Sequence, residues 1–218
     1  MTILDSMDFS DATSILNNYS KAILKGKVAH QEIAPYRGEY LNLNSSLPKI
    51  AAVLVLLYPI KNETYFVLIE RTKYQGKHSG QISFPGGKKE EADTNIIETA
   101  LREAREETNI KKEGLNIIGE LSKIYIPPSN FEVTPILAFS KNRPNFIPNK
   151  REVLEIIEVK IKDLVQPETI KKIKLQFNNG KTLNTPYFNL NSKTVWGATA
   201  MILNELKHYI LDMQKEKS

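Results

Sequence analysis

A glycine-rich turn followed by an acidic helix is the feature that most constrains this chain. The turn is Ser83-Phe84-Pro85-Gly86-Gly87, and residues 101–110 read LREAREETNI. At about 100° per residue, the three glutamates at positions 103, 106 and 107 share one helix face. An adjacent face is apolar, with Ile97, Ala100, Leu101 and Ala104. The pattern therefore predicts a helix over residues 94–108 that lies on a sheet and presents its carboxylates at the edge of the contact.

The glutamates alone leave two interpretations open. Clustered carboxylates repel one another by a few tenths of a kcal/mol per pair, whereas hard divalent cations reverse that sign. A plain solvated face, or pairing with Arg102 and Arg105, would also explain them. A glycine pair, however, has no Cβ to block the close approach of a ligand. The pair at Gly86 and Gly87, fifteen residues before Arg-Glu-x-x-Glu-Glu, favours a metal site.

Strands and helices alternate along the rest of the chain. Apolar, β-rich runs predict strands over residues 51–58, 64–70, 115–123, 133–139, 153–161, 170–177 and 183–189, with a hairpin turn at Asn178-Asn179-Gly180. Helical spacing predicts a first helix from Ser10 or Asp11 to Gly26 and a last one over residues 194–213. A polar connection follows the first helix, and residues 73–89 read as a loop. This order predicts an α/β (α+β) fold in which helices flank a central mixed sheet.

The composition fits one globular domain without cysteine chemistry. The chain has 218 residues, of which 41% are hydrophobic and 25% charged, enough for one sizeable core. It contains no cysteine, which excludes disulfides, thiolate metal sites and a cysteine nucleophile. The longest apolar run, residues 50–58, is half of what a membrane helix needs, and the first residues do not form a signal peptide. We therefore expect a cytoplasmic protein with no membrane partner.

The charge balance favours anionic partners. A formal net charge of +5 and a pI of about 9.1 attract phosphorylated small molecules and nucleic acid alike. Basic residues concentrate between positions 141 and 181, where they form either a solvated face or a nucleic-acid surface. Charge alone does not decide between the two.

The turn and the helix together resemble the Nudix box. That box reads Gly, five residues, Glu, seven residues, then Arg-Glu-apolar-x-Glu-Glu-x-Gly-apolar. The matching residues are Gly87, Arg102, Glu103, Ala104, Glu106, Glu107 and Ile110. Asp93 stands in place of the first Glu, Asn109 replaces the closing Gly, and one extra residue precedes Arg102. The resemblance to the Nudix family implies an α/β/α sandwich with a central mixed β-sheet.

The longer spacing before Arg102 resembles that of the coenzyme A pyrophosphatase branch of the family. The branch has an upstream motif of Leu-Leu-Thr-x-Arg-Ser, three residues, Arg, three residues, Gly, three residues and Phe-Pro-Gly-Gly. The chain keeps this register at Arg71, Gly80 and the glycine-rich turn. Gly76 stands where the second Arg belongs, and Glu90 where a later Asp belongs, which weakens the assignment to coenzyme A. Residues 129–135 and 196–203 also resemble this branch.

The resemblance implies roles for the residues of the box. The implied metal ligands are Gly87 (through its carbonyl), Glu103, Glu106 and Glu107, with Mg²⁺ or Mn²⁺ as the ion. Glu106 and Glu152 are the candidates for the group that activates water, and Arg102 would orient the glutamates. The implied substrate contacts are Arg71, His78, Gly80, Phe84 and Gly86. Plainer interpretations stay open: Arg71 in a strand-end salt bridge, His78 ordering its loop, and Glu152 as a surface acid beside Arg151.

We therefore expect a divalent-metal-dependent Nudix hydrolase that cleaves the pyrophosphate bond of coenzyme A or acyl-CoA to 3′,5′-ADP and (acyl-)4′-phosphopantetheine. One alternative is another nucleoside diphosphate derivative, such as ADP-ribose or a dinucleoside polyphosphate. A second is a non-catalytic module that binds nucleotide or RNA, although nucleic acid is the disfavoured partner. Residues 49–214 would form the Nudix domain, and residues 1–48 a helical extension packed on it. A homodimer is left open.

Overall fold

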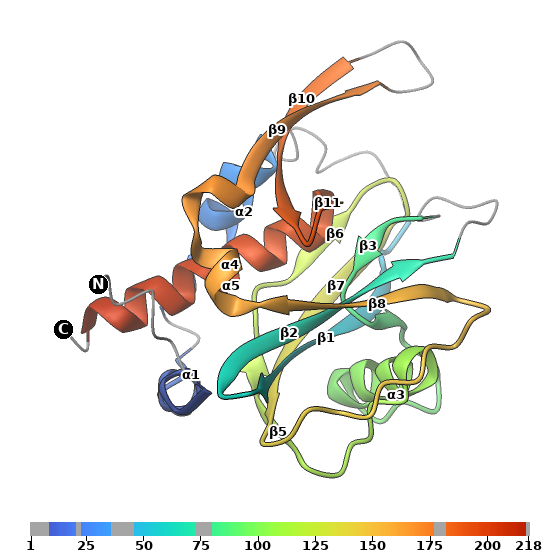
Figure 1. The fold of residues 1–218 in the computed structure, drawn as a ribbon. Helices are drawn as coiled ribbons and strands as arrows, with labels where there is room; N and C mark the ends of the chain where they lie inside the picture. Colours follow the sequence, from blue (N-terminus) through green and yellow to red (C-terminus); the bar gives the residue numbers. More distant parts are fainter. Residues whose placement is uncertain (1–8, 21–22, 36–45, 73–79, 177–181, 217–218) are drawn as a thin grey trace.

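The computed structural model describes residues 9–20, 23–35, 46–72, 80–176 and 182–216. Its centre is an eight-stranded sheet (Figure 1) made of β1 (Lys49–Ile60), β2 (Glu63–Arg71), β3 (Ile82–Ser83), β4 (Gly86–Lys88), β5 (Leu115–Glu120), β6 (Ile124–Ile126), β7 (Phe131–Ser140) and β8 (Val153–Lys160). The main path runs β3-β2-β1-β7-β5, while β4, β6 and β8 pair with β1, β7 and β2. β1 and β7 are parallel, and β1 and β2 are antiparallel. The expected mixed sheet is confirmed.

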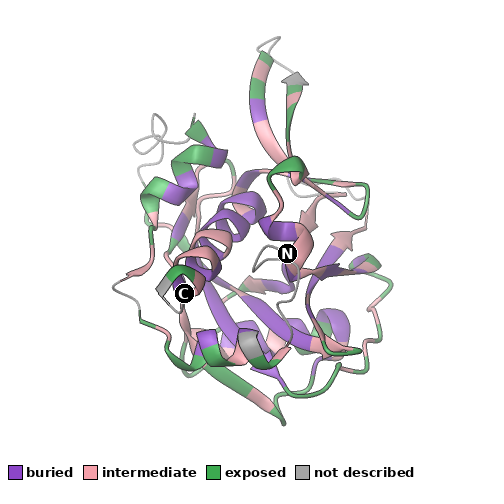
Figure 2. Cartoon of the chain, turned by 60° about the vertical axis from the view of Figure 1, so that its left-hand side comes forward, coloured by how far each residue is buried: buried purple, intermediate pink, exposed green. Residues whose placement is uncertain are grey.

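Strand β1 is apolar on both sides because helices cover both faces of the sheet. Leu54 and Leu56 share a buried cluster with Ala104 of α3 (Ile96–Thr108). Val55 and Leu57, which point to the opposite face, share the other cluster with α5 (Gly197–Glu216). A strand buried on both faces needs such a continuous apolar run. Figure 2 shows α5 as a largely buried helix, and α3, the sheet and α5 form the three layers of an α/β/α sandwich.

Helix α3 has a polar cap at each end. Asn95 precedes it, and the Asn95 side chain accepts a hydrogen bond from the Glu98 backbone amide at 3.0 Å. Asn109 ends it in the left-handed conformation, with φ 62°. The expected helix over residues 94–108 is confirmed, with its start two residues later. The cap at Asn109 takes the place of the glycine that the box pattern expects.

The N-terminal region forms two short helices on α5. They are α1 (Phe9–Asn17) and α2 (Lys27–Ile33), so the expected single helix ending at Gly26 is wrong. The turn at Gly26 has φ 47° and is held by the buried carboxylate of Glu205, which accepts hydrogen bonds from the Gly26 and Ser122 amides at 3.0 Å each. The sequence around position 26 signals a break, but it does not show that α2 follows at once.

A second, three-stranded sheet contributes residues to the core at one end and projects from the main body at the other (Figure 1). It has the order β11-β10-β9, made of β9 (Ile170–Gln176), β10 (Thr182–Leu190) and β11 (Lys193–Val195). α4 (Ile161–Val165) and the 3₁₀ turn Pro167–Thr169 connect it to β8. The hairpin turn expected at Asn178-Asn179-Gly180 lies outside the described residues.

Short strands account for most of the remaining differences from the expectation. β3 and β4 occupy part of the expected loop, β6 follows β5 after a break, and β11 takes residues from the expected start of the last helix. The predicted stripe of that helix is confirmed, because Ile202, Leu206, Tyr209 and Met213 are all buried. Within the described ranges, none of the helices is long and apolar enough to cross a membrane.

Candidate active site

Asp93 anchors the acidic face of α3 through Arg102. The Asp93 carboxylate is 6% exposed and accepts hydrogen bonds from Arg102 Nε at 2.9 Å and Nη2 at 3.0 Å. Thr99 Oγ1 and the Glu90 amide donate to the same carboxylate at 3.0 and 2.9 Å. These donors, with Arg102 foremost, hold the pKa of Asp93 well below its usual range. Asp93 is therefore ionised in the folded protein and fixes the direction of the guanidinium.

The same guanidinium reaches two of the predicted ligands. Arg102 Nη1 donates to Glu103 Oε1 at 3.0 Å and to Glu106 Oε2 at 3.3 Å, while Nη2 also donates to the Lys88 carbonyl at 3.0 Å. Arg102 thus contacts the glutamates as the sequence analysis expects of an orienting residue. Burial, opposed by Arg102 and reinforced by Glu106 and Glu152, raises the pKa of Glu103.

Glu107, the third predicted glutamate ligand on α3, is fully buried. Its Oε1 accepts a hydrogen bond from Arg71 Nη1 at 2.7 Å, and its Oε2 accepts one from the Gly86 amide at 2.8 Å. Burial raises the pKa of Glu107 to about 7, with further increases from Glu103 and Glu152 and opposing effects from Arg71 and Gly86. The side chain is therefore a carboxylate that ionises near neutral pH and is held in one position.

The glycine pair lets the turn pass close to the helix and the sheet. A Cβ on Gly87 would lie 2.4 Å from the Glu103 carboxylate, so only glycine allows this contact. A Cβ on Gly86, whose φ is 155°, would lie 2.3 Å from the Ala52 carbonyl. The backbone of Gly87, whose carbonyl is the implied ligand, is therefore a neighbour of Glu103. Gly86 instead binds Glu107 and closes the strand pairing of β4 with β1.

Glu152 approaches the cluster from another element. It precedes β8, and its backbone carbonyl accepts a hydrogen bond from the Thr72 amide at 2.8 Å. Asn149, whose amide donates to the Glu107 carbonyl at 2.9 Å, also donates from its side chain to Glu152 at 3.4 Å. The charge of Glu152 contributes to the raised pKa values of Glu103 and Glu107. Two segments far apart in the sequence thus bring four glutamates into one electrostatic neighbourhood.

The charges of this neighbourhood suit a divalent cation. Its acids are Glu103, Glu106, Glu107, Glu152 and Asp93, and the arginines paired with them are Arg71 and Arg102. With Glu107 ionised, five negative charges against two positive ones leave an excess of three. Oxygen ligands of this kind are those that Mg²⁺ and Mn²⁺ prefer. The residues present therefore fit the ion that the resemblance implies.

The carboxylates do not, however, converge on one point. Among the described residues, no group of three acidic or histidine side chains has the arrangement of a metal site. Glu107 faces Arg71, whereas Glu103 and Glu106 share one nitrogen of Arg102. The physical reason is that each buried carboxylate takes the nearest cation or amide donor. An ion at this site would require a change of side-chain partners.

The predicted substrate contacts have different positions. Arg71 and Gly86 adjoin the cluster through Glu107, and Gly80 turns at φ 66° with its amide 3.4 Å from the Thr72 carbonyl. Phe84 is 1% exposed and its ring lies 6.2 Å from that of Phe66, so its side chain belongs to the core and does not offer the expected contact. His78 lies outside the described residues.

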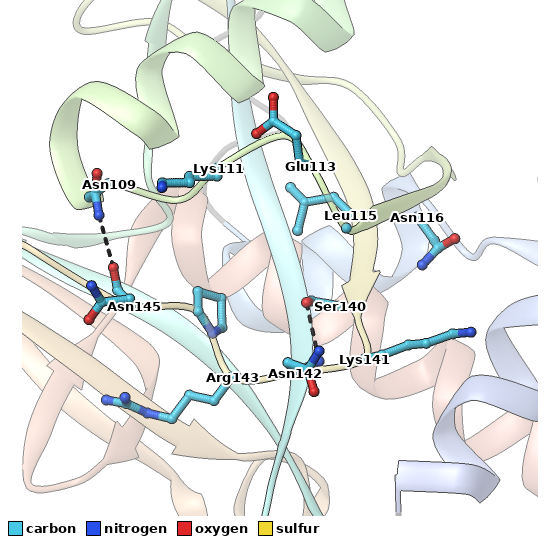
Figure 3. Close-up of a pocket in the computed structure, with 12 residues that line it drawn as sticks. Asn109, Lys111, Glu113, Leu115, Asn116, Ser140, Lys141, Asn142, Arg143 and Asn145 are labelled. Carbon is cyan, nitrogen blue, oxygen red and sulfur yellow. Dashed lines mark hydrogen bonds between the residues drawn. The ribbon is translucent and has the colours of Figure 1, made fainter.

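A hollow of about 520 Å³ lies at the C-terminal end of α3 (Figure 3). Asn109, Lys111, Ser140 and Asn145 are among its lining residues, and none of the four glutamates is. Figure 3 shows that the side chains of Lys141 and Arg143 point away from one another. The Arg143 guanidinium binds Glu158 at 2.7 and 2.8 Å. The hollow therefore presents a mixed polar surface without a convergent set of catalytic groups.

Two residues that position the site were not singled out as such from the sequence. Asp93 was noted only as a departure from the box pattern, although its place in that pattern is the signal that identifies it. Asn149 gave no signal, because its contacts join a loop to the end of a helix forty residues earlier. Both act by holding other residues.

Known proteins match most of this chain. The family model of the NUDIX domain matches residues 48–183. An uncharacterized Nudix hydrolase, NudL, from Yersinia enterocolitica is 32% identical over 161 residues, which cover 73% of this chain and 80% of that protein. The NudL of Pectobacterium atrosepticum is 34% identical over 167 residues, covering 74% and 83%. A crystal structure of a NUDIX hydrolase from Nitrosomonas europaea has a TM-score of 0.49 at 17% identity, covering 79% of this chain and 75% of that one.

Proposed function

The chain belongs to the Nudix family and is a pyrophosphohydrolase, and from this premise we propose that it hydrolyses coenzyme A or acyl-CoA. The products would be 3′,5′-ADP and 4′-phosphopantetheine or its acyl form. The activity that this proposal refines is hydrolysis of a nucleoside diphosphate derivative. The finer assignment is supported by the register of Arg71, Gly80 and the Phe84–Gly87 turn, which resembles the coenzyme A pyrophosphatase branch.

The packing of Gly87 against Glu103 is the observation that carries the proposal. A Cβ built on Gly87 would lie 2.4 Å from the Glu103 carboxylate, so the glycine backbone passes close to this carboxylate, whose pKa is raised by burial and by neighbouring glutamates. A solvated acidic helix face would have neither the burial of Glu107 nor the fixed guanidinium of Arg102. The arrangement therefore places metal-ligating oxygens next to a turn whose close packing depends on glycine.

The side chains around this point have distinct tasks in the proposal. Glu103 and Glu107, with the Gly87 carbonyl, hold Mg²⁺ or Mn²⁺, and Glu106 assists them. When bound, such an ion neutralises charge on the pyrophosphate and lowers the pKa of water. Arg102 orients Glu103 through its bonds to Asp93. One of the two exposed carboxylates, Glu106 or Glu152, accepts the proton of the attacking water.

Glu152 is the better placed of the two candidates to act as base. Arg102 contacts Glu106 at 3.3 Å, whereas the contact of Glu152 is a 3.4 Å hydrogen bond from the neutral Asn149 side chain. Glu152 is exposed and adds to the negative potential at both Glu103 and Glu107. Glu152 therefore has a neutral hydrogen-bond donor as its neighbour, whereas Glu106 is held by a cation, and this leaves Glu152 the freer of the two to contact a water molecule.

A second substrate class is kept for a specific reason. Gly76 stands where the upstream motif of the coenzyme A branch has an arginine, so one cationic contact to substrate is missing from the pattern. ADP-ribose and dinucleoside polyphosphates contain the same phosphoanhydride bond and do not need a contact to a 3′-phosphate. They form the alternative to be tested beside coenzyme A. A cytoplasmic location and a homodimer remain proposals that accompany this function.

A substrate panel tests the proposal. The protein would be incubated with Mg²⁺ or Mn²⁺ and one of four substrates: coenzyme A, acetyl-CoA, ADP-ribose or diadenosine tetraphosphate. The products would be identified by mass spectrometry. We expect 3′,5′-ADP from both coenzyme A substrates, and a loss of at least 10²-fold in Glu103→Gln. Glu98→Gln is the matched control, because Glu98 lies on the same helix but pairs with Lys112 at 2.6 Å. Cleavage of ADP-ribose alone would select the alternative substrate, and equal rates in Glu103→Gln and parent would exclude the site.

A further inference from the structure

Arg71 is the cation that the innermost glutamate of the site faces. It is the last residue of β2, at a register shift where β2 pairs with β8, and its Nη1 lies 2.7 Å from Glu107 Oε1. The backbone of Arg71 is fixed, because its amide donates to the Gln81 carbonyl at 3.0 Å and the next amide donates to Glu152. Any movement of Arg71 is therefore confined to its side chain.

The two partners of this ion pair differ in their freedom. Glu107 has no exposed surface, and the Gly86 amide holds its other oxygen at 2.8 Å. The Arg71 side chain is 23% exposed, so solvent already reaches part of it. If one member of the pair moves, it is the arginine, whose long stem can rotate while its head stays hydrated.

A divalent ion and Arg71 would compete for the same carboxylate. Two cations at one buried glutamate repel each other strongly, because the protein interior screens charges less than water does. The charge of Glu103 contributes to the raised pKa of Glu107, so the two carboxylates are close neighbours, and the Arg71 guanidinium donates its hydrogen bond to Glu107. Arg102, in contrast, is locked on Asp93 by two hydrogen bonds. Arg71 is thus the displaceable cation of the cluster, and Arg102 the permanent one.

We propose that Arg71 is an internal counter-ion of Glu107 that competes with the divalent cation and, once displaced, binds a phosphate of the substrate. This inference rests on the proposed function and adds to it the order in which the ion and the substrate bind. Glu107 would exchange Arg71 for the ion first, and the released guanidinium would then be available to an anion beside the glycine-rich turn. The interaction that neutralises Glu107 before binding thereby supplies a substrate contact afterwards, because guanidinium groups suit phosphate oxygens.

Direct measurement of Mn²⁺ binding tests this order without turnover. Free Mn²⁺ would be titrated by electron paramagnetic resonance at fixed pH and without substrate, in the parent, Arg71→Met and Arg71→Lys. We expect Arg71→Met to bind Mn²⁺ about tenfold more tightly than the parent, with Arg71→Lys between them by at least twofold. The KM for the substrate found by the panel should rise in both variants. Arg105→Met is the matched control, because Arg105 is an exposed arginine on α3, and its affinity should stay within twofold.

The outcomes separate this inference from the proposed function. Unchanged or weaker Mn²⁺ binding in Arg71→Met, with the parent binding normally, overturns the inference alone. No Mn²⁺ binding by the parent, or binding that Glu103→Gln leaves unchanged, overturns the proposed function. The double variant Arg71→Met/Glu107→Gln removes both charges, and we expect it to fold and to lose the gain in affinity. If Arg71→Met does not fold, Arg71→Lys decides, and an affinity equal to that of the parent there contradicts the inference.

Discussion

The guanidinium of Arg102 binds both carboxylate oxygens of Asp93, with Nε 2.9 Å from Oδ1 and Nη2 3.0 Å from Oδ2. The remaining nitrogen of Arg102 is left to contact Glu103 at 3.0 Å. Asp93 occupies the place where the box pattern has its first glutamate, with a shorter side chain and one more residue before Arg102. Its task is to direct a guanidinium that directs the glutamates.

Replacement of Asp93 by Asn should lower the free energy of unfolding by about 2–4 kcal/mol, because a buried, partly screened ion pair loses one partner. Activity should fall as well, since Arg102 is then free to rotate away from Glu103. Urea unfolding at pH 7.5 and the kcat for the best substrate measure the two effects. Glu91→Gln, at an exposed acid two residues earlier, should change neither. A fully stable Asp93→Asn protein would show that the pair contributes nothing to the fold.

The two glycines of the turn should respond differently to alanine. In Gly87→Ala the new methyl group would meet the Glu103 carboxylate at 2.4 Å, and that flexible side chain can move. We expect a folded protein whose kcat is at least tenfold lower. In Gly86→Ala the methyl group would meet the Ala52 carbonyl at 2.3 Å, where only backbone could move. We expect this variant to lose several kcal/mol or not to fold.

Gly114→Ala separates backbone strain from this steric clash. Gly114 has φ 86°, but a Cβ there would meet nothing within 4 Å. Its substitution should therefore cost only about 1 kcal/mol, the strain of a left-handed alanine. Thermal unfolding of the three variants gives the ranking. Equal losses in Gly86→Ala and Gly114→Ala would contradict the close approach of the turn to β1.

The buried Glu107 should make the stability of the protein depend on pH. Burial raises its folded-state pKa to about 7 from the usual 4.5. Between these pH values the folded state keeps a proton that the unfolded state has released, so the free energy of unfolding falls as pH rises from about 4.5 to 7. The contribution is fully present below pH 4.5 and absent above pH 7. Its size is on the order of 3 kcal/mol.

Glu107→Gln should remove this dependence, because glutamine does not titrate. We expect the stability of the variant relative to the parent to rise between pH 4.5 and pH 7 and then to level off, in urea unfolding experiments with a chelator present. Glu98→Gln, at a partly exposed acid of the same helix, is the control. A difference between Glu107→Gln and parent that stays constant across this range would show that Glu107 ionises normally.

Glu205 should be the residue that holds the N-terminal helices in place. Its carboxylate has no exposed surface and accepts hydrogen bonds from the Gly26 and Ser122 amides and, at 3.4 Å, from His30. Glu205→Ala would leave these buried donors unpaired and should cost about 3 kcal/mol. Protease cleavage near residue 26 should become faster. Asp212 lies on the same helix as Glu205 and forms a partly exposed ion pair with Lys25. Asp212→Asn breaks this pair and should cost less than 1 kcal/mol.

The sequence predicted the layers of the fold well, because burial on two faces leaves a clear pattern. The run of apolar residues in β1 and the spacing of Ala100, Leu101 and Ala104 in α3 identified the sheet and one helix that covers it. The short strands β3, β4, β6 and β11 were missed, since two or three residues give no periodicity. β4 and β3 are placed by pairing with the earlier strands β1 and β2. β6 and β11 are placed by pairing with their neighbours β7 and β10.

The site was predictable in its membership but not in its pairing. Helical spacing placed three glutamates on one face, and the contact of Arg102 with Glu106, four residues later, follows from the same spacing. The choice of Arg71 by Glu107 could not be derived, because it depends on how the end of β2 meets α3. For the same reason Phe84 was placed beside substrate, whereas the core takes its side chain.

The central claim is that the glutamates of α3 hold the ion that the reaction needs. Anomalous diffraction from crystals soaked in Mn²⁺ together with a non-hydrolysable substrate analogue tests it most directly. We expect a peak about 2.1 Å from carboxylate oxygens of Glu103 and Glu107, with the Arg71 guanidinium moved toward the analogue. Mn²⁺ bound away from all four glutamates, in a protein that still needs the ion for turnover, would contradict it.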